Sequence, residues 1–203
     1  LVIRRQRQMC IRDSSWGEEH AQQLLEDLLA QCNGKSDISA LSQYFLGSIV
    51  LIRRNADGSE VDVVDGQQRL TTISLLLRAL KDRLTGKMSR KLGERLMEEG
   101  DPLTGVEDRP RLNLRRRDVT FYRKQILSDS GLKSTIDVRQ IEEAQANLWR
   151  NTQLYRRLLA SMDTAAVTLL AQYLVVKCIL VTVSTEDFDS AYQIFNVLND
   201  RGM

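Results

Sequence analysis

The sequence predicts an α+β protein in which a small sheet with its own helices is followed by a mainly helical lobe. Two apolar, β-rich runs at residues 44–52 and 60–64 flank the turn residues Asn-Ala-Asp-Gly-Ser, which indicates a β-hairpin. Apolar residues then recur at three- and four-residue spacing over most of residues 118–175, as in amphipathic helices. A β-branched run at 177–184 predicts a strand that returns to the sheet.

The composition favours a cytoplasmic protein. The 203 residues, 42% of them hydrophobic, suffice for one large or two small packed domains. No apolar run reaches membrane-spanning length and no signal-peptide pattern is present, so no membrane partner is expected. Cys10, Cys32 and Cys178 lack a Cys-x-x-Cys pair, which argues against a disulfide framework or a zinc site. The single histidine, His20, excludes chemistry that needs a His pair within this chain, and we expect it to be exposed on a first helical turn.

Both ends of the chain look incomplete. Residues 1–14 show neither strand alternation nor a helical apolar face, and the string Arg-Gln-Met-Cys-Ile-Arg-Asp-Ser resembles translated sequencing-adapter DNA. We therefore interpret residues 1–14 as non-native and exclude them from the fold prediction. Without their four arginines and one aspartate, the 29 basic and 27 acidic residues become 25 and 26, and the net charge changes from +2 to −1. The basic balance is thus no argument for a nucleic-acid partner.

Residues 15–84 are predicted to form the sheet-containing core. Ser15 is the expected N-cap of a leucine-rich helix that Asn33-Gly34 ends near residue 32. The hairpin follows, and its second strand leads into a helix whose apolar residues include Leu70, Ile73 and Leu77.

The rest of the chain divides into a connection and a helical lobe. Residues 85–117 are predicted to hold one short helix near 88–98 and then a loop. Residues 118–203 are predicted to form the lobe, with helices from residue 118 and at 138–161, 164–175 and 187–198, and the returning strand before the last helix.

The most informative stretch is Asp65-Gly66-Gln67-Gln68-Arg69, between the second hairpin strand and the helix. A glycine at such a turn lets the backbone approach a ligand, and the amides of a first helical turn bind anions. Arg69 adds a donor fork suited to phosphate or carboxylate. The structural alternative is a polar helix cap with Asp65 as the N-cap.

Four segments of the chain resemble the N-terminal domain of GmrSD-type restriction endonucleases. They are Ser15-Trp16 with its leucine-rich helix, Tyr44-Phe45-Leu46-Gly47-Ser48-Ile49-Val50, the stretch from Val63 to Thr72, and the segment from Ala191 to Gly202. The most specific are Asp-Gly-Gln-Gln-Arg and Phe-x-x-Leu-Asn-Asp-Arg-Gly, in this order on one chain.

The resemblance implies a ParB/sulfiredoxin-like core in which a Gly-x-x-Arg turn grips nucleotide phosphates, here Gly66 and Arg69. It further implies binding and hydrolysis of a nucleoside triphosphate (GTP, ATP, CTP or UTP), with Mg²⁺, in bacterial defence against phage DNA that is often modified. The implied partners are DNA and an HNH-type nuclease domain absent from this chain, and a homo-oligomer is one option. The family's initial Tyr-Gln-Arg strand is also missing, because only Ser15-Trp16 match its end.

Each residue of the turn receives a predicted role. Gly66 permits backbone approach, and Arg69 neutralises phosphate charge and stabilises charge in the transition state. Asp65 is the candidate ligand for magnesium or a ribose hydroxyl, and Gln67 or Gln68 the candidate to orient a water. Thr71 is placed with Gly66 and Arg69 among the nucleotide-binding residues.

Asn199 and Arg201 are predicted to face the Asp65–Arg69 turn and complete the phosphate site. The structural alternative is a helix C-cap with Gly202 in a left-handed conformation, which does not explain Arg201.

A basic run, Arg109 to Lys124 with Asp118 as its only local counter-charge, is either a solvated loop and helix start or a contact for the DNA backbone. Trp16 and Trp149 are expected to be core anchors.

Three functions follow as alternatives. The first is nucleotide hydrolysis that gates a defence nuclease, the second a ParB-like site that nicks DNA, and the third a nucleotide-sensing or DNA-binding module without chemistry. One carboxylate and no histidine in the turn make the second a poor fit for metal-dependent cleavage.

Overall fold

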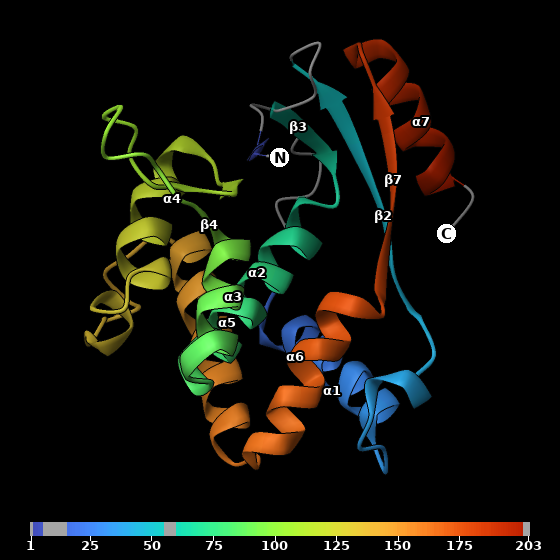
Figure 1. The fold of residues 1–203 in the computed structure, drawn as a ribbon. Helices are drawn as coiled ribbons and strands as arrows, with labels where there is room; N and C mark the ends of the chain where they lie inside the picture. The colour runs from blue at the N-terminus through green and yellow to red at the C-terminus, as the bar shows by residue number, and fades with distance from the viewer. Residues whose placement is uncertain (1, 6–15, 55–59, 201–203) are drawn as a thin grey trace.

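The computed structural model describes residues 2–5, 16–54 and 60–200, with the backbone alone at 2–5 and 198–200 (Figure 1). It confirms the predicted α+β class, because a mixed sheet stands beside a layer of packed helices. The sheet has five strands in the order β6-β1-β3-β2-β7. Their bounds are β1 Val2–Arg5, β2 Tyr44–Arg53, β3 Glu60–Asp65, β6 Leu112–Asn113 and β7 Cys178–Thr185.

The predicted hairpin and returning strand are confirmed. β2 and β3 pair antiparallel, with Leu51 opposite Val63, and β7 pairs parallel with β2 along its length. The hairpin turn, 55–59, lies outside the described residues. Four of the residues left out of the fold prediction form β1, which pairs parallel with both β3 and β6.

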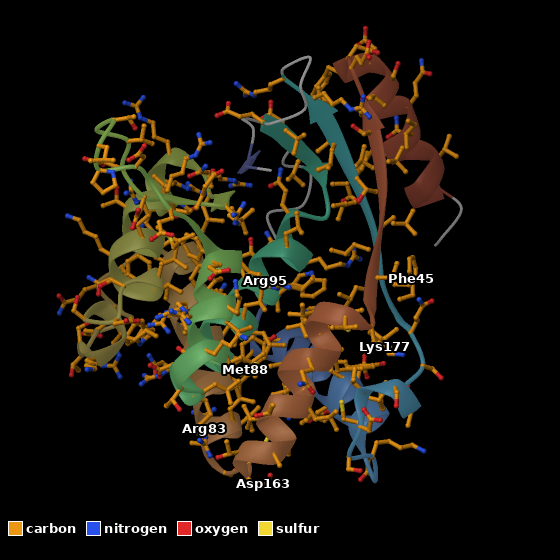
Figure 2. The ribbon with its side chains drawn as sticks, viewed as in Figure 1. Phe45, Arg83, Met88, Arg95, Asp163 and Lys177 are labelled. Carbon is orange, nitrogen blue, oxygen red and sulfur yellow. The ribbon has the colours of Figure 1, made fainter. Side chains whose placement is uncertain are left out.

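The two faces of the central strands carry separate apolar clusters. We call one the α2 face, because Leu70 of α2 (Gln67–Arg83) packs on it with Ile49 and Val63. The other is the α7 face, where Ala191 of α7 (Phe188–Asp200) covers Val50. Near the start of β2, Phe45 projects outward with 62% of its surface exposed (Figure 2).

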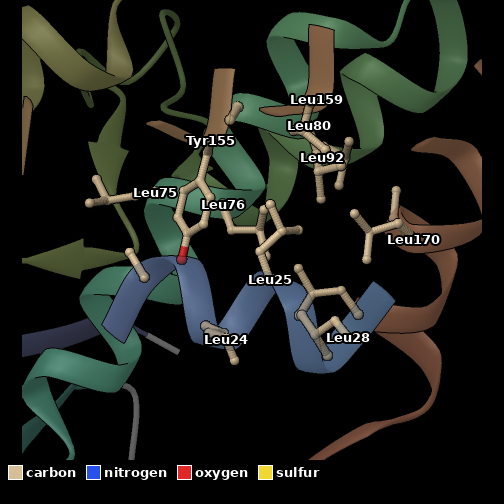
Figure 3. Packing of buried hydrophobic residues seen from close by; sticks show 14 of the residues in the cluster. Leu24, Leu25, Leu28, Leu75, Leu76, Leu80, Leu92, Tyr155, Leu159 and Leu170 are labelled. Atoms are coloured by element: carbon tan, nitrogen blue, oxygen red, sulfur yellow. The ribbon is translucent and has the colours of Figure 1, made fainter. Parts of the chain in front are cut away.

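The main core lies between the helices, because their apolar stripes face one another there. Leucines of α1 and leucines of α2 belong to one cluster, to which α5 contributes Tyr155 and Leu159 and α6 contributes Leu170 (Figure 3). Trp149 is a buried part of this cluster, which confirms its prediction as a core anchor. The other α-helices are α1 Glu18–Cys32, α3 Gly86–Leu96, α4 Arg116–Phe121, α5 Glu143–Ala160 and α6 Thr164–Val176.

Several local predictions need correction. Gly17, rather than Ser15, stands at the N-cap of α1, and Ser15 lies outside the described residues. The helix expected at 138–161 begins only at Glu143, because turns and bends occupy residues 138–141. The loop after α3 contains a two-stranded ladder of β4 (Met97–Glu98) and β5 (Arg109–Pro110). His20 is exposed as expected, with its ring stacked on that of Trp16 at a centroid distance of 5.5 Å.

After α4 the chain continues as a π-helix, η2 (Tyr122–Leu127), which α2 holds through buried polar groups. Arg78, fully buried in α2, donates through Nε to the carbonyl of Ile126 and through Nη2 to Asp129, at 3.0 and 2.7 Å. Ser74 and Tyr122 share a hydrogen bond, and burial raises the pKa of Tyr122 to about 12. Burial also lowers the pKa of Arg78. These hydrogen bonds anchor α2 at Ser74 and Arg78, and the predicted turn lies at the N-terminal end of the helix, before both residues.

Among the described helices, none has the length and apolarity needed to cross a bilayer.

Candidate functional site

Gly66 forms the N-cap of α2 with a left-handed backbone, φ 86° and ψ 10°. A Cβ at this position would lie 2.4 Å from Cγ2 of Ile49 in β2. Glycine is therefore required at this position for two reasons, the backbone conformation and the close approach of the turn to the sheet. The alternative with Asp65 as the N-cap is wrong, because Gly66 holds that position and no side chain caps the helix.

The first turn of α2 presents a positive helix end without an acidic residue. Its amides lack acceptors within the helix, since the first intrahelical bond runs from the amide of Leu70 to the carbonyl of Gly66 at 3.0 Å. The two glutamines differ. Gln67 donates through Nε2 to the carbonyl of Val63 at 2.7 Å, which ties its amide to β3, whereas Gln68 lines a cavity.

Arg69 lies against the backbone of β2. Its Nη1 donates to the carbonyl of Ser48 at 2.6 Å, and its guanidinium group covers Gly47. Within the described part of the chain this is its single hydrogen bond, and no ion pair involves it. The side chain is half-buried, so the remaining N–H groups of a permanently charged group stay available at the helix start.

Asp65 is the last residue of β3 and lies next to an irregularity in the β2–β3 pairing. The register pairs Asp65 with Val50, whose side chain lies under α7. Gly47 pairs with Leu180, which belongs to the α2 face. The structure therefore brings Gly66, Gln67 and Arg69 together around the turn, with the guanidinium group of Arg69 on the α2 face over Gly47.

A cavity of about 220 Å³ lies beside the N-terminal half of α2, with Gln68 and Thr71 in its wall. The hydroxyl of Thr71 donates to the carbonyl of Gln67 at 2.8 Å. Trp16, expected to be a core anchor, is instead half-buried and lines this cavity. The other lining residues come from α2, α4 with the segment before it, and α5: Thr72, Leu75, Leu114, Arg115, Arg117, Asp118, Glu143, Ala144, Asn147, Leu148 and Asn151.

Only indirect signals in the sequence point to these additional residues. Arg115 and Arg117 belong to the basic run, and their spacing in the sequence does not predict that they line a cavity. Asn147 and Asn151 lie one turn apart on α5, polar positions in an otherwise apolar stripe. Asn151 is buried and donates through Nδ2 to the backbone carbonyl of Trp16 at 2.8 Å, which fixes one wall of the cavity.

The basic run has more counter-charges than the predicted single one, Asp118. Arg109 pairs with Glu98 at 2.7 Å and with Glu60 at 3.6 Å, because the β4–β5 ladder and the sheet bring distant carboxylates to it. Arg117 lies 3.6 Å from Glu142. The exposed remainder of the run is Arg116, Arg123 and Lys124.

The second predicted half of the site is described only in part. Arg201 and Gly202 lie outside the described residues, and Asn199 is placed through the helical backbone of α7 alone. α7 packs on the face of the sheet that carries Val50, and Arg69 lies over Gly47 on the α2 face. The pairing of Asn199 and Arg201 with the turn stays a prediction.

A resident metal would have few protein ligands here. In the described part of the chain, no three His, Cys, Asp or Glu residues cluster as a metal site. Asp65 supplies one carboxylate, which suits Mg²⁺ held mainly by phosphates and waters.

Comparison with known protein families gives a match over most of the chain. The family model described as "GmrSD restriction endonuclease, N-terminal domain" matches residues 12–203. A search of curated proteins finds no match to the chain. Since the family match covers nearly all the described residues, the chain belongs to the GmrSD restriction endonuclease N-terminal domain family.

Proposed function

We propose that the N-terminal end of α2 binds a nucleoside triphosphate and that the domain hydrolyses it, which gates DNA cleavage by a GmrSD-type restriction endonuclease. Membership of the family supports the restriction context and DNA as the substrate. The nucleotide and its hydrolysis are what the resemblance to the family implies, and the anion-binding chemistry of the turn supports them.

The observation that carries the proposal is the unneutralised positive charge at the start of α2. Arg69 stands in the first turn, where no acid is present, and no carboxylate among the described residues pairs with it. A cation next to the positive end of a helix dipole is unfavourable by roughly 0.3–1 kcal/mol. An anion bound there removes this cost and takes hydrogen bonds from both the amides and the guanidinium group.

The cavity supplies the place for the rest of the nucleotide. Its volume of about 220 Å³ is below the roughly 300–1,000 Å³ of pockets that enclose a whole drug-sized ligand. We infer that it holds the base or the sugar, with the phosphates outside it at the helix start. Arg115 and Arg117 then lie beside the path of the phosphates.

The catalytic roles follow from what each side chain already contacts. The amide nitrogen of Gln67 bonds the strand, so Gln68 is the better candidate to orient an attacking water. Arg69 stabilises charge on the transferred phosphoryl group. Asp65 would hold Mg²⁺, and the bound ion would neutralise phosphate charge. GTP, ATP, CTP and UTP remain alternative substrates.

The test is nucleotide affinity and phosphate release for the 203-residue chain, wild type beside Arg69→Ala. Loss of charge-assisted hydrogen bonds should weaken triphosphate binding about ten-fold to a hundred-fold. Lys87→Ala is the matched control, since Lys87 is an exposed cation in the first turn of another helix, α3. An Arg69→Ala protein that binds as wild type does would overturn the proposal.

The same measurements separate the two other functions. Triphosphate binding without phosphate release in the wild type would make the domain a sensor. Nicking of plasmid DNA without nucleotide, abolished by Asp65→Ala, would make it a nuclease.

A further inference from the structure

Arg69 is positioned by the main chain of β2. It crosses from the first turn of α2 to the strand and places Nη1 2.6 Å from the carbonyl oxygen of Ser48. Because a carbonyl of a paired strand is fixed by its neighbours, this bond holds the guanidinium group at one place more firmly than a flexible side-chain partner would.

Gly47 provides the surface on which the guanidinium group lies. A Cβ built on Gly47 would lie 2.7 Å from Cζ, 2.9 Å from Nη2 and 3.0 Å from Nε of Arg69. These three similar distances mean that the group lies flat over this position, so any side chain at 47 would occupy the same space. The φ of 107° at Gly47 is also one that side-chain-bearing residues rarely adopt.

An irregularity in β2 creates this arrangement. Phe45 pairs with Ile179 and Gly47 with Leu180, so Leu46 is an extra residue in the ladder with β7. Bulges of this kind bend a strand and redirect its groups, and they are frequent beside active sites. Here the bulge directly precedes the two residues that hold Arg69.

We propose that Gly47, together with the bulge at Leu46, is a positioning element that holds Arg69 for the triphosphate. With its face on Gly47 and Nη1 on Ser48, the group keeps N–H donors at its edge that point away from the strand. The inference rests on the proposed function, because it assigns to Gly47 an effect that acts through Arg69 on a bound nucleotide.

A double-mutant cycle tests it, with triphosphate affinity and free energy of unfolding measured for wild type, Gly47→Ala, Arg69→Ala and the double variant. We expect Gly47→Ala to weaken binding about ten-fold, near the loss of one charge-assisted hydrogen bond. In the Arg69→Ala background the second substitution should cost no further affinity. Losses that multiply in the double variant would mean that Gly47 acts independently of Arg69, and would overturn the inference.

Arg69→Lys provides a second test that leaves Gly47 unchanged. Lysine keeps the charge but has no planar group to lie on Gly47 and no fork. We expect Arg69→Lys to bind the triphosphate about as weakly as Arg69→Ala, and full affinity in this variant would refute the positioning role. If Arg69→Ala itself leaves binding unchanged, the proposed function fails; if it weakens binding while Arg69→Lys and Gly47→Ala do not, only the positioning role fails.

Discussion

Gly66 and Arg69 show how much of the site depends on single residues. Gly66 lets the chain leave β3 in a left-handed conformation and pass within contact of Ile49. That turn sets the direction of the first turn of α2, from which Arg69 reaches β2 and Gln68 reaches the cavity. The local geometry therefore separates residues that are consecutive in the sequence into different chemical surroundings.

We expect Gly66→Ala to destabilise the fold by more than the strain of a left-handed backbone alone would. Gly34 is the control, because its φ is also positive, +68°, and nothing lies within 4 Å of a Cβ there. Left-handed strain costs both variants about 1–2 kcal/mol. Gly66→Ala should lose a further 1–3 kcal/mol or so, since Ile49 must move. Urea unfolding measures both, and equal losses would show that Ile49 yields freely.

At the scale of elements, α2 connects the site to the helical layer. Its buried face packs in the main core, and Arg78 and Lys81 reach Asp129 just beyond η2, at 2.7 and 2.8 Å. A buried guanidinium group with an exposed carboxylate partner is costly to leave unpaired, so η2 and α2 should hold each other in place. This attachment fixes the axis of α2 behind its N-terminal end.

The stability that the α2–η2 attachment contributes should depend on pH and should be lost in acid. The hydrogen bond from Lys81, with the charges of Lys81 and Arg78, lowers the pKa of Asp129. Because the folded pKa is the lower one, this contribution is complete above the unfolded value of about 3.9 and is lost as pH falls through the folded value. Asp129→Asn should therefore be less stable than wild type at pH 6, and the difference should disappear in acid.

Urea unfolding between pH 2 and 7 checks the Asp129 prediction. Glu107→Gln, which removes an exposed carboxylate outside the ion pairs of the described residues, should reproduce the wild-type pH profile. A stability difference for Asp129→Asn that stays constant down to pH 2 would speak against the ion pairs as its cause.

In the whole molecule the main apolar cluster lies in the helical layer, and the sheet has two smaller clusters of its own. The main core begins at Ala21 and takes most of its buried residues from the helices and the segments that connect them, with Leu112 contributed by β6. β1, by contrast, contributes pairing to β3 and β6 from the first residues of the chain. The helical layer should therefore stay folded when β1 is removed, whereas the part of the sheet around β3 should be destabilised.

A chain of residues 12–203, the range of the family match, tests this division. We expect its far-UV circular dichroism to keep the helical signal of the full chain. Amides of β3 should exchange with solvent about ten-fold faster or more, since the strand loses a neighbour. Amides of β7, which pairs with β2, serve as the internal control. Loss of the helical signal, or β3 amides that exchange as slowly as before, would contradict the separation.

The sequence by itself determined the class of fold, the hairpin, the returning strand and the strand–glycine–helix turn. These depend on local patterns: apolar periodicity, turn residues and the unique freedom of glycine. The family followed from short motifs for the same reason. The Gly-x-x-Arg turn needed no tertiary information to indicate an anion site, because a helix start and its arginine are neighbours in the chain.

Only the tertiary structure decided what surrounds that turn. Gly47 and Ser48 meet Arg69 through a sheet register that no local pattern specifies. The walls of the cavity come from Trp16, α4 and α5, up to 135 positions apart in the chain for Trp16 and Asn151. The carboxylates that neutralise Arg109 likewise arrive through pairing of distant strands. Such contacts depend on how whole elements pack. The sequence pattern predicts each element, but it does not predict which residues of two elements will be in contact.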